Sequence, residues 1–134
     1  MPVEEGLELN RLEGLSFMED SILRSIRGLL GPDSDYDVFD PDLIIFINGA
    51  FSTLTQLGVG PSNGFRITGD SEVWSDFIGS ERLDLESVKT YIYLKVKMIF
   101  DPPANSSMMS NYEQMCKELE WRLNVAVDPG TYNQ

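Results

Sequence analysis

The most regular hydrophobic pattern in the chain runs from Pro41 to Leu57, where apolar residues recur at steps of three and four. This spacing places them on one face of an α-helix. The residues on that face are Leu43, Ile47, Ala50, Phe51, Leu54 and Leu57. Asp40 stands at the N-cap position, and Gly58 follows the last apolar residue as a C-terminal cap would. Because residues 44–46 are apolar as well, the pattern predicts a helix that packs on more than one side and lies at the centre of the fold.

A shorter amphipathic stretch precedes this helix. Its apolar residues are Ile22, Leu23, Ile26, Leu29 and Leu30. Asp20 or Ser21 can act as the N-cap, and Gly31-Pro32 ends the pattern. The pattern therefore predicts a helix over residues 22–30, followed by an acidic, turn-rich segment.

Residues 83–100 allow two interpretations. Leu85, Val88, Ile92, Val96 and Ile99 fit one helical face, whereas residues 91–98 taken alone alternate as a strand would. A stretch of about 18 residues without a turn signal favours a helix, because strands are usually shorter. Asp101-Pro102-Pro103 ends it, since proline blocks helical continuation.

The last apolar line predicts a helix that begins after Asn105 or Ser106 and runs to about Val125. Its members are Met109, Tyr112, Cys116, Leu119 and Leu123. Ser110 and Glu113 have the spacing of a capping box, which would start the helix one turn later. The methionines of the last two helices, Met98, Met108, Met109 and Met115, can either fill the core or form an adaptable subunit contact.

The segment 62–79 has a different character. Turn signals at Asn63-Gly64 and Gly69-Asp70 surround a short β-prone run, which predicts a protruding hairpin or an extended loop. The segment carries a large apolar load for a loop. Trp74 and Phe77 can fold back to cover the core, or they can form an exposed contact.

Together these patterns predict an all-α domain, a small bundle of about four helices with a protruding loop or hairpin between the second and third main helices. The domain would occupy residues 18–127. Residues 1–17 lack a clean period and are expected to be a flexible or partner-dependent leader, and residues 128–134 a C-terminal tail.

The amino-acid composition excludes more classes of function than the hydrophobic pattern does. The 134 residues include 22 acidic and 10 basic side chains, a formal net charge of −12. Tight binding of nucleic acid needs clustered Lys and Arg, so it is disfavoured here. No apolar run approaches the roughly 20 residues of a membrane span, and the first residues do not form a signal peptide. An intracellular chain without membrane contact is expected.

The usual catalytic and metal-binding residues are scarce. The chain has no histidine, which removes the commonest general base and metal ligand. The single cysteine, Cys116, falls on an apolar helix face and is interpreted as a buried structural thiol. The acidic run that includes Asp33, Asp35 and Asp37 lacks the glycine and the final glutamate of a calcium loop. We therefore predict no catalytic, metal or cofactor residues, and a protein that is not an enzyme.

Several stretches taken together resemble a known family. They are DVFDPDLIIFINGAFSTLTQLGVGP at 37–61, WSDF at 74–77, VKTYIYLKVKMIFDPP at 88–103 and ELEWRL at 118–123. They are similar to small head–tail connector (adaptor) proteins of long-tailed bacteriophages and prophages of Gram-positive bacteria. The likeness extends from about Met18 to Val125.

The resemblance implies a virion protein of the neck, made in the host cytoplasm, that forms a homo-oligomeric ring, typically a dodecamer. The ring would lie beneath the portal protein, bind a stopper or tail-completion protein, and let DNA pass without specific binding. From the residues we expect the loop 62–79 to contact a neighbouring subunit or the next ring. The expected contact residues are Phe65, Ile67, Trp74 and Phe77 in the loop, with Asp128 and Tyr132 in a tail that docks on the portal or another partner.

Two other classes of function stay open on the sequence. An acidic inhibitor that mimics DNA would explain the net charge, although the carboxylates concentrate at residues 33–42 and at helix starts, where capping accounts for them. A small enzyme that uses only Asp or Glu would need paired carboxylates with apolar flanks, and no such pair is visible.

Overall fold

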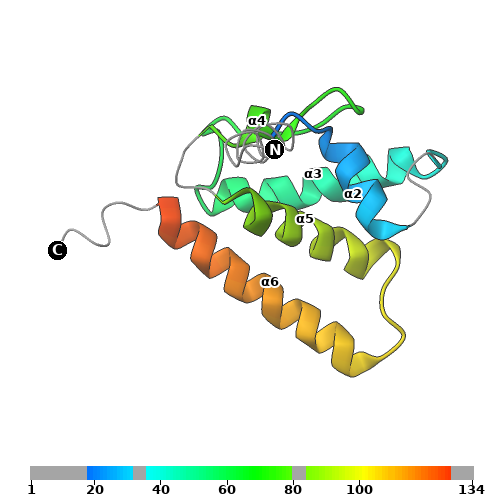
Figure 1. Cartoon of the computed structure of the whole chain (residues 1–134). Helices are drawn as coiled ribbons and strands as arrows, with labels where there is room; N and C mark the ends of the chain where they lie inside the picture. Colours follow the sequence, from blue (N-terminus) through cyan, green and yellow to red (C-terminus); the bar gives the residue numbers. More distant parts are fainter. Residues whose placement is uncertain (1–17, 32–35, 80–83, 128–134) are drawn as a thin grey trace, which may run out of the picture.

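The computed structural model describes residues 18–31, 36–79 and 84–127. Within these ranges the chain forms five helices (Figure 1), namely α2 (Ile22–Leu30), α3 (Asp40–Gln56), α4 (Trp74–Phe77), α5 (Leu85–Phe100) and α6 (Ser106–Val127). The described residues contain no strand, only an isolated antiparallel bridge between Ser21 and Val73. The predicted all-α bundle is confirmed. The predicted leader and tail lie outside the described residues.

Helix α5 lies at the centre of the bundle and packs against α2, α3 and α6, whereas the main partners of α3 are α5 and α2. The prediction that α3 is the central helix is therefore wrong. The reason is the distribution of buried side chains. Those of α3 follow one stripe, and Ile45 on its outer face is 66% exposed. In α5, by contrast, Tyr91, Ile92 and Leu94 are all buried although they point in different directions.

Residues 91–98, which also alternate as a strand would, are helical in this structure. Asp84 caps the helix, because its carboxylate accepts a hydrogen bond from the Glu86 N–H at 3.2 Å. At the far end, Lys97 Nζ pairs with Asp101 Oδ2 at 2.6 Å. The helical interpretation, which the length of the stretch favours, is confirmed.

The sequence left open which residue caps α2 and where α6 begins, and the observed caps answer both questions. Ser21 caps α2 by accepting from the Arg24 N–H at 3.2 Å, so Ser21 rather than Asp20 is the N-cap. Asn105 Oδ1 accepts from the N–H groups of Ser107 and Met108 at 2.7 and 3.3 Å. Helix α6 therefore begins at the earlier of its two predicted starts.

The predicted N-cap of α3 is wrong. Asp40 is the first residue of the helix, and Phe39 occupies the cap position without a side-chain hydrogen bond. The Asp40 carboxylate instead accepts two hydrogen bonds from Arg27 Nη1, at 2.7 and 2.9 Å. The guanidinium on the neighbouring helix carries a full positive charge, whereas the N–H groups at a helix start carry only partial charges, so the carboxylate pairs with the guanidinium.

The segment between α3 and α5 lies against α2 and α3, and its large side chains point inward. Val59, Ile67, Trp74 and Phe77 are buried in the same core as the helices. Asn48 of α3 holds this segment by its backbone, since its Nδ2 donates to the Ile67 carbonyl at 2.9 Å and its Oδ1 accepts from the Ile67 N–H at 2.7 Å. The sequence allowed Trp74 and Phe77 either to cover the core or to form an exposed contact. In the structure they cover the core.

Candidate subunit-contact surfaces

The four loop residues predicted to contact a neighbour belong to the core of their own subunit. Ile67, Trp74 and Phe77 are at most 1% exposed, and Phe65 is half-buried. Phe51 of α3 packs against Phe65 and Phe77 with ring centroids 4.9 and 4.8 Å apart. A contact between these side chains and a neighbour would require the loop to open, and it stays a prediction. Asp128 and Tyr132 lie outside the described residues.

Hydrogen bonds fix Trp74 in this position. Its indole Nε1 donates to Ser25 Oγ at 3.0 Å, and its backbone N–H donates to the Asp20 carbonyl at 3.3 Å. The Ile22 N–H donates to the Glu72 carbonyl at 3.0 Å. The loop is thus attached to the start of α2 by both main-chain and side-chain bonds.

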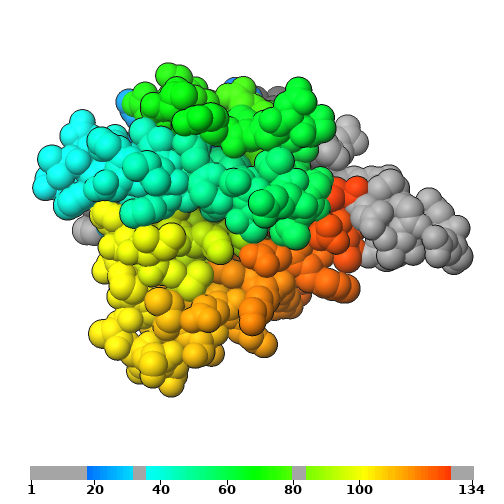
Figure 2. All heavy atoms as spheres, turned by 180° about the vertical axis from the view of Figure 1, so that it is seen from behind, coloured from blue at the N-terminus to red at the C-terminus, as the bar shows by residue number. Residues whose placement is uncertain are grey.

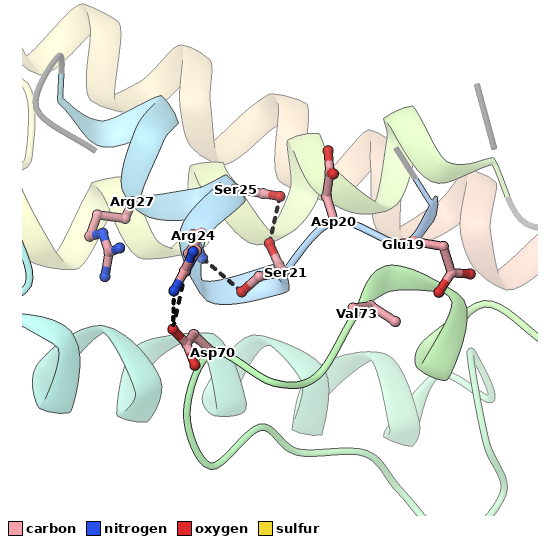
Figure 3. A pocket seen from close by; sticks show the side chains of 8 residues that line it. All are labelled: Glu19, Asp20, Ser21, Arg24, Ser25, Arg27, Asp70 and Val73. Atoms are coloured by element: carbon pink, nitrogen blue, oxygen red, sulfur yellow. Dashed lines mark hydrogen bonds and ion pairs between the residues drawn. The ribbon is translucent and has the colours of Figure 1, made fainter. Parts of the chain in front are cut away.

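A polar cleft of about 660 Å³ lies beside these bonds (Figure 3), lined by Glu19, Asp20, Ser21, Arg24, Ser25, Arg27, Asp70 and Val73. Arg24 donates to Asp70 Oδ2 through Nη2 at 2.8 Å and Nε at 3.1 Å, and this bond lowers the pKa of the Asp70 carboxyl. Both partners are exposed, so solvent screens the pair and it adds little stability. The described residues hold no group of His, Cys, Asp and Glu that could bind a metal ion. The Arg24–Asp70 pair thus connects α2 to the loop across the cleft. The residues that line the cleft do not form a recognisable catalytic group.

A second, apolar hollow lies at one end of the bundle, where the C-terminal ends of α2 and α5 meet the N-terminal end of α3 (Figure 1). We call it the aromatic pocket; it has a volume of about 250 Å³ and is lined by Arg27, Leu30, Gly31, Tyr36, Phe39, Leu43 and Phe100. Phe39 makes edge contacts with Tyr36 and Phe100, with ring centroids 5.8 and 5.2 Å apart. Tyr36 is 53% exposed. Large aromatic side chains that stay open to water are typical of binding surfaces.

The Arg27–Asp40 pair forms the polar side of this pocket. The side chains of the two residues are only 12% and 22% exposed, so water screens the pair weakly. Because its charges are paired, the guanidinium can border an apolar hollow at low cost. The pocket thus combines aromatic edges with one fixed, neutralised cation.

Helix α6 presents the other unpartnered surface. Over its 22 residues only Cys116, Leu119 and Leu123 are buried, and its main partner is α5. In Figure 2 it lies along one edge of the molecule. Met108 and Met115 are 47% and 43% exposed and Trp121 is 66% exposed, while Met98 packs against the core. The methionine cluster therefore divides between the core and the surface.

Two hydrogen bonds hold α6 in place. The Tyr91 hydroxyl donates to Glu120 Oε2 at 2.7 Å, and Asn124 Nδ2 donates to the Leu57 carbonyl at 2.8 Å. Burial, together with the Glu120 carboxylate, raises the pKa of Tyr91, so its hydroxyl stays protonated and able to donate. These bonds attach one side of α6 to the bundle and leave the opposite side open.

Sequence reasoning missed the two exposed aromatic sites, although a signal for each exists. Trp121 lies two residues from both Leu119 and Leu123, about 200° around a helix from the buried line. Tyr36 and Phe39 stand in the acidic, turn-rich segment before α3. Apolar residues off a helical face or within a charged segment are the ones that a subunit does not bury for itself.

Cys116 is buried, as predicted, and burial raises the pKa of its thiol to about 11. Compared with the ordinary value of 9.0, this leaves about 100-fold less thiolate at pH 8. Because the thiolate is the reactive form, we expect native protein to react with a disulfide reagent at least 100-fold more slowly than protein unfolded in denaturant. Absorbance of the released thiol measures both rates, and equal rates would show that Cys116 is accessible.

Comparison with known proteins places the chain in a family. The family described as "Phage connector protein" matches residues 22–130, which is most of the sequence. The chain belongs to this family, and the resemblance seen in the sequence is confirmed. Neither a curated protein nor a solved structure matches it. Membership indicates a structural role as a head–tail connector and a location in the virion. None of the described helices is long and apolar enough to cross a membrane.

Proposed function

We propose that this chain assembles as a ring, a dodecamer, beneath the portal of the DNA-filled head. The ring joins the head to a stopper or tail-completion protein in the neck and extends the channel through which DNA passes. It acts by contact alone and catalyses no reaction.

One observation carries this proposal beyond membership of the family. A single subunit leaves apolar side chains open to water on two separate surfaces, the aromatic pocket and the outer side of α6. Exposed apolar patches of this kind mark protein–protein contacts. A ring needs two different contact surfaces on each subunit, because a heterologous contact repeated by rotation closes on itself.

The charge of the chain fits passage of DNA rather than its capture. Twelve copies at −12 each would carry −144 formally. Negative charge facing a channel repels DNA phosphates, so DNA slides through such a ring without adhering.

The same charge opposes closure of the ring, which leads to a testable salt dependence. Screening shortens from about 10 Å at 0.1 M salt to about 3 Å at 1 M. We therefore expect the ring fraction without portal to rise with salt concentration, and portal to reduce the salt requirement. Sedimentation velocity at several salt concentrations measures this fraction. Rings that are equally stable at low and high salt without portal would contradict the prediction.

Electron microscopy of the purified protein, alone and mixed with portal, tests the function itself. We expect rings of this chain seated on one end of the portal and coaxial with its channel. Portal particles of unchanged outline, with this chain in excess, would refute the proposal.

The alternative function, an acidic inhibitor that mimics DNA, finds less support in the described residues. Mimicry needs free carboxylates spaced along one surface. Among the described acidic residues, Asp40, Asp70, Asp101 and Glu118 are each paired with an Arg or Lys, which leaves fewer carboxylates free for mimicry.

A further inference from the structure

Trp121 is the most exposed aromatic side chain among the described residues, at 66%. It stands on the open side of α6, where none of the described elements of its own subunit covers it. An exposed indole presents a large apolar area to water, and tryptophan is among the residues that contribute most to binding when buried in a contact.

The aromatic pocket has the size and chemistry to receive such a side chain. An apolar cavity of about 150 Å³ accepts benzene, so a pocket of about 250 Å³ has room for the two rings of an indole. The rings of Tyr36, Phe39 and Phe100 provide edge-to-face partners. The Arg27 guanidinium, which also lines the pocket, can stack on an indole face.

The pocket and Trp121 lie at opposite ends of one subunit. Asn124, close to Trp121 on α6, bonds to Leu57 just after the C-terminal end of α3. Phe39 and Leu43 of the pocket lie at the N-terminal end of the same helix. Over its 17 residues α3 is about 25 Å long, so Trp121 does not reach the pocket of its own subunit. Figure 1 shows the N-terminal end of α3 and the C-terminal end of α6 on opposite sides of the molecule.

Charge favours the same pairing. Asp37 and Asp42 flank the pocket, one just before and one within the first turn of α3. Lys117 lies one helical turn before Trp121 and makes no ion pair in the described part of the chain. When the indole of one copy enters the pocket of the next, this lysine is available to pair with Asp37 or Asp42.

We infer that Trp121 of one copy is seated in the aromatic pocket of the next copy, so that identical subunits join head to tail. This inference rests on the proposed ring and names the contact that closes it. The contact is heterologous, because each copy offers its indole on one side and its pocket on the other.

Two variants separate the two halves of this contact. Trp121→Ala removes the indole and leaves the pocket intact. Gly31→Trp fills the pocket from its rim: the backbone of Gly31 is extended with φ −158°, and an added Cβ meets no atom within 4 Å. The matched controls are Ile45→Ala, at a side chain that is also 66% exposed, and Gly49→Trp, at a glycine where a Cβ is equally unobstructed. Both controls lie on α3, away from the pocket and from α6.

The readout is native mass at a salt and portal concentration at which the wild type assembles. Loss of such an anchor weakens each contact at least 30-fold. We therefore expect each variant alone to stay monomeric, with a melting temperature close to that of the wild type under conditions where the wild type is monomeric as well. A 1:1 mixture of the two is expected to form a dimer and stop, because the mixture has one intact contact per pair. The controls should form rings.

Three results would overturn the inference. Rings of Trp121→Ala at wild-type concentrations would show that the indole is not the anchor. Rings of that variant that no longer bind portal would assign Trp121 to another protein instead of a second copy. A wild type that never assembles, even with portal, would refute the proposed ring together with this contact. Of the three results, this one alone would count against the proposed function.

Discussion

Replacing Trp74 with alanine is expected to lower the free energy of unfolding by about 3–5 kcal/mol. The indole is fully buried, packs in the shared core and donates to Ser25 Oγ. Its removal leaves a cavity beneath the loop and deprives that hydroxyl of a partner. Urea unfolding, monitored by far-UV circular dichroism under conditions where the chain is monomeric, measures the loss.

Trp121→Ala is the matched control for this experiment, since it removes the same side chain from an exposed site. Changes at exposed positions usually stay within about 0.5 kcal/mol. If Trp74→Ala and Trp121→Ala unfolded at the same urea concentration, Trp74 would not support the subunit's own core. The other interpretation that the sequence allows, in which Trp74 contacts a neighbouring subunit, would then be favoured.

Gly60→Ala should be almost as damaging, with an expected loss of roughly 3 kcal/mol. Gly60 has φ +91°, a left-handed conformation that strains any residue with a Cβ. A Cβ there would also fall on the buried ring of Phe77, 2.7 Å from Cζ. The ring cannot move aside easily, because it packs against Phe51 and Phe65.

Gly58→Ala separates the two causes. Gly58 also has a positive φ, +79°, but an added Cβ meets no atom within 4 Å. We expect this variant to lose only the strain contribution, about 1 kcal/mol. Thermal unfolding of both variants measures the difference. Equal losses would mean that Phe77 does not press against this turn.

The sequence predicts the helices well because their signals are local. Spacing, proline and glycine positions and polar caps identify α2, α3, α5 and α6 within a few residues of their observed ends. Cys116 is predictable for the same reason, since its burial follows from its place on an apolar helical line.

What the sequence does not predict depends on contacts between distant residues. The inward position of Trp74 requires Asn48 of α3 to hold Ile67, and the Asp40 carboxylate turns to Arg27 instead of capping its helix. No local pattern encodes these pairs. The burial of the predicted contact residues Ile67, Trp74 and Phe77 is not predictable for the same reason, because an aromatic loop suggests a contact until its packing partners are known.

The native mass of the assembled particle tests most directly whether copies of this chain cover one another's apolar surfaces. At high salt without portal, we predict a closed particle with a mass that is a multiple of 15.1 kDa, about 181 kDa for twelve copies. With portal present, we predict that the mass of the portal particle rises by the same amount. A mass of 15.1 kDa at every protein and salt concentration, unchanged by addition of portal, would contradict it.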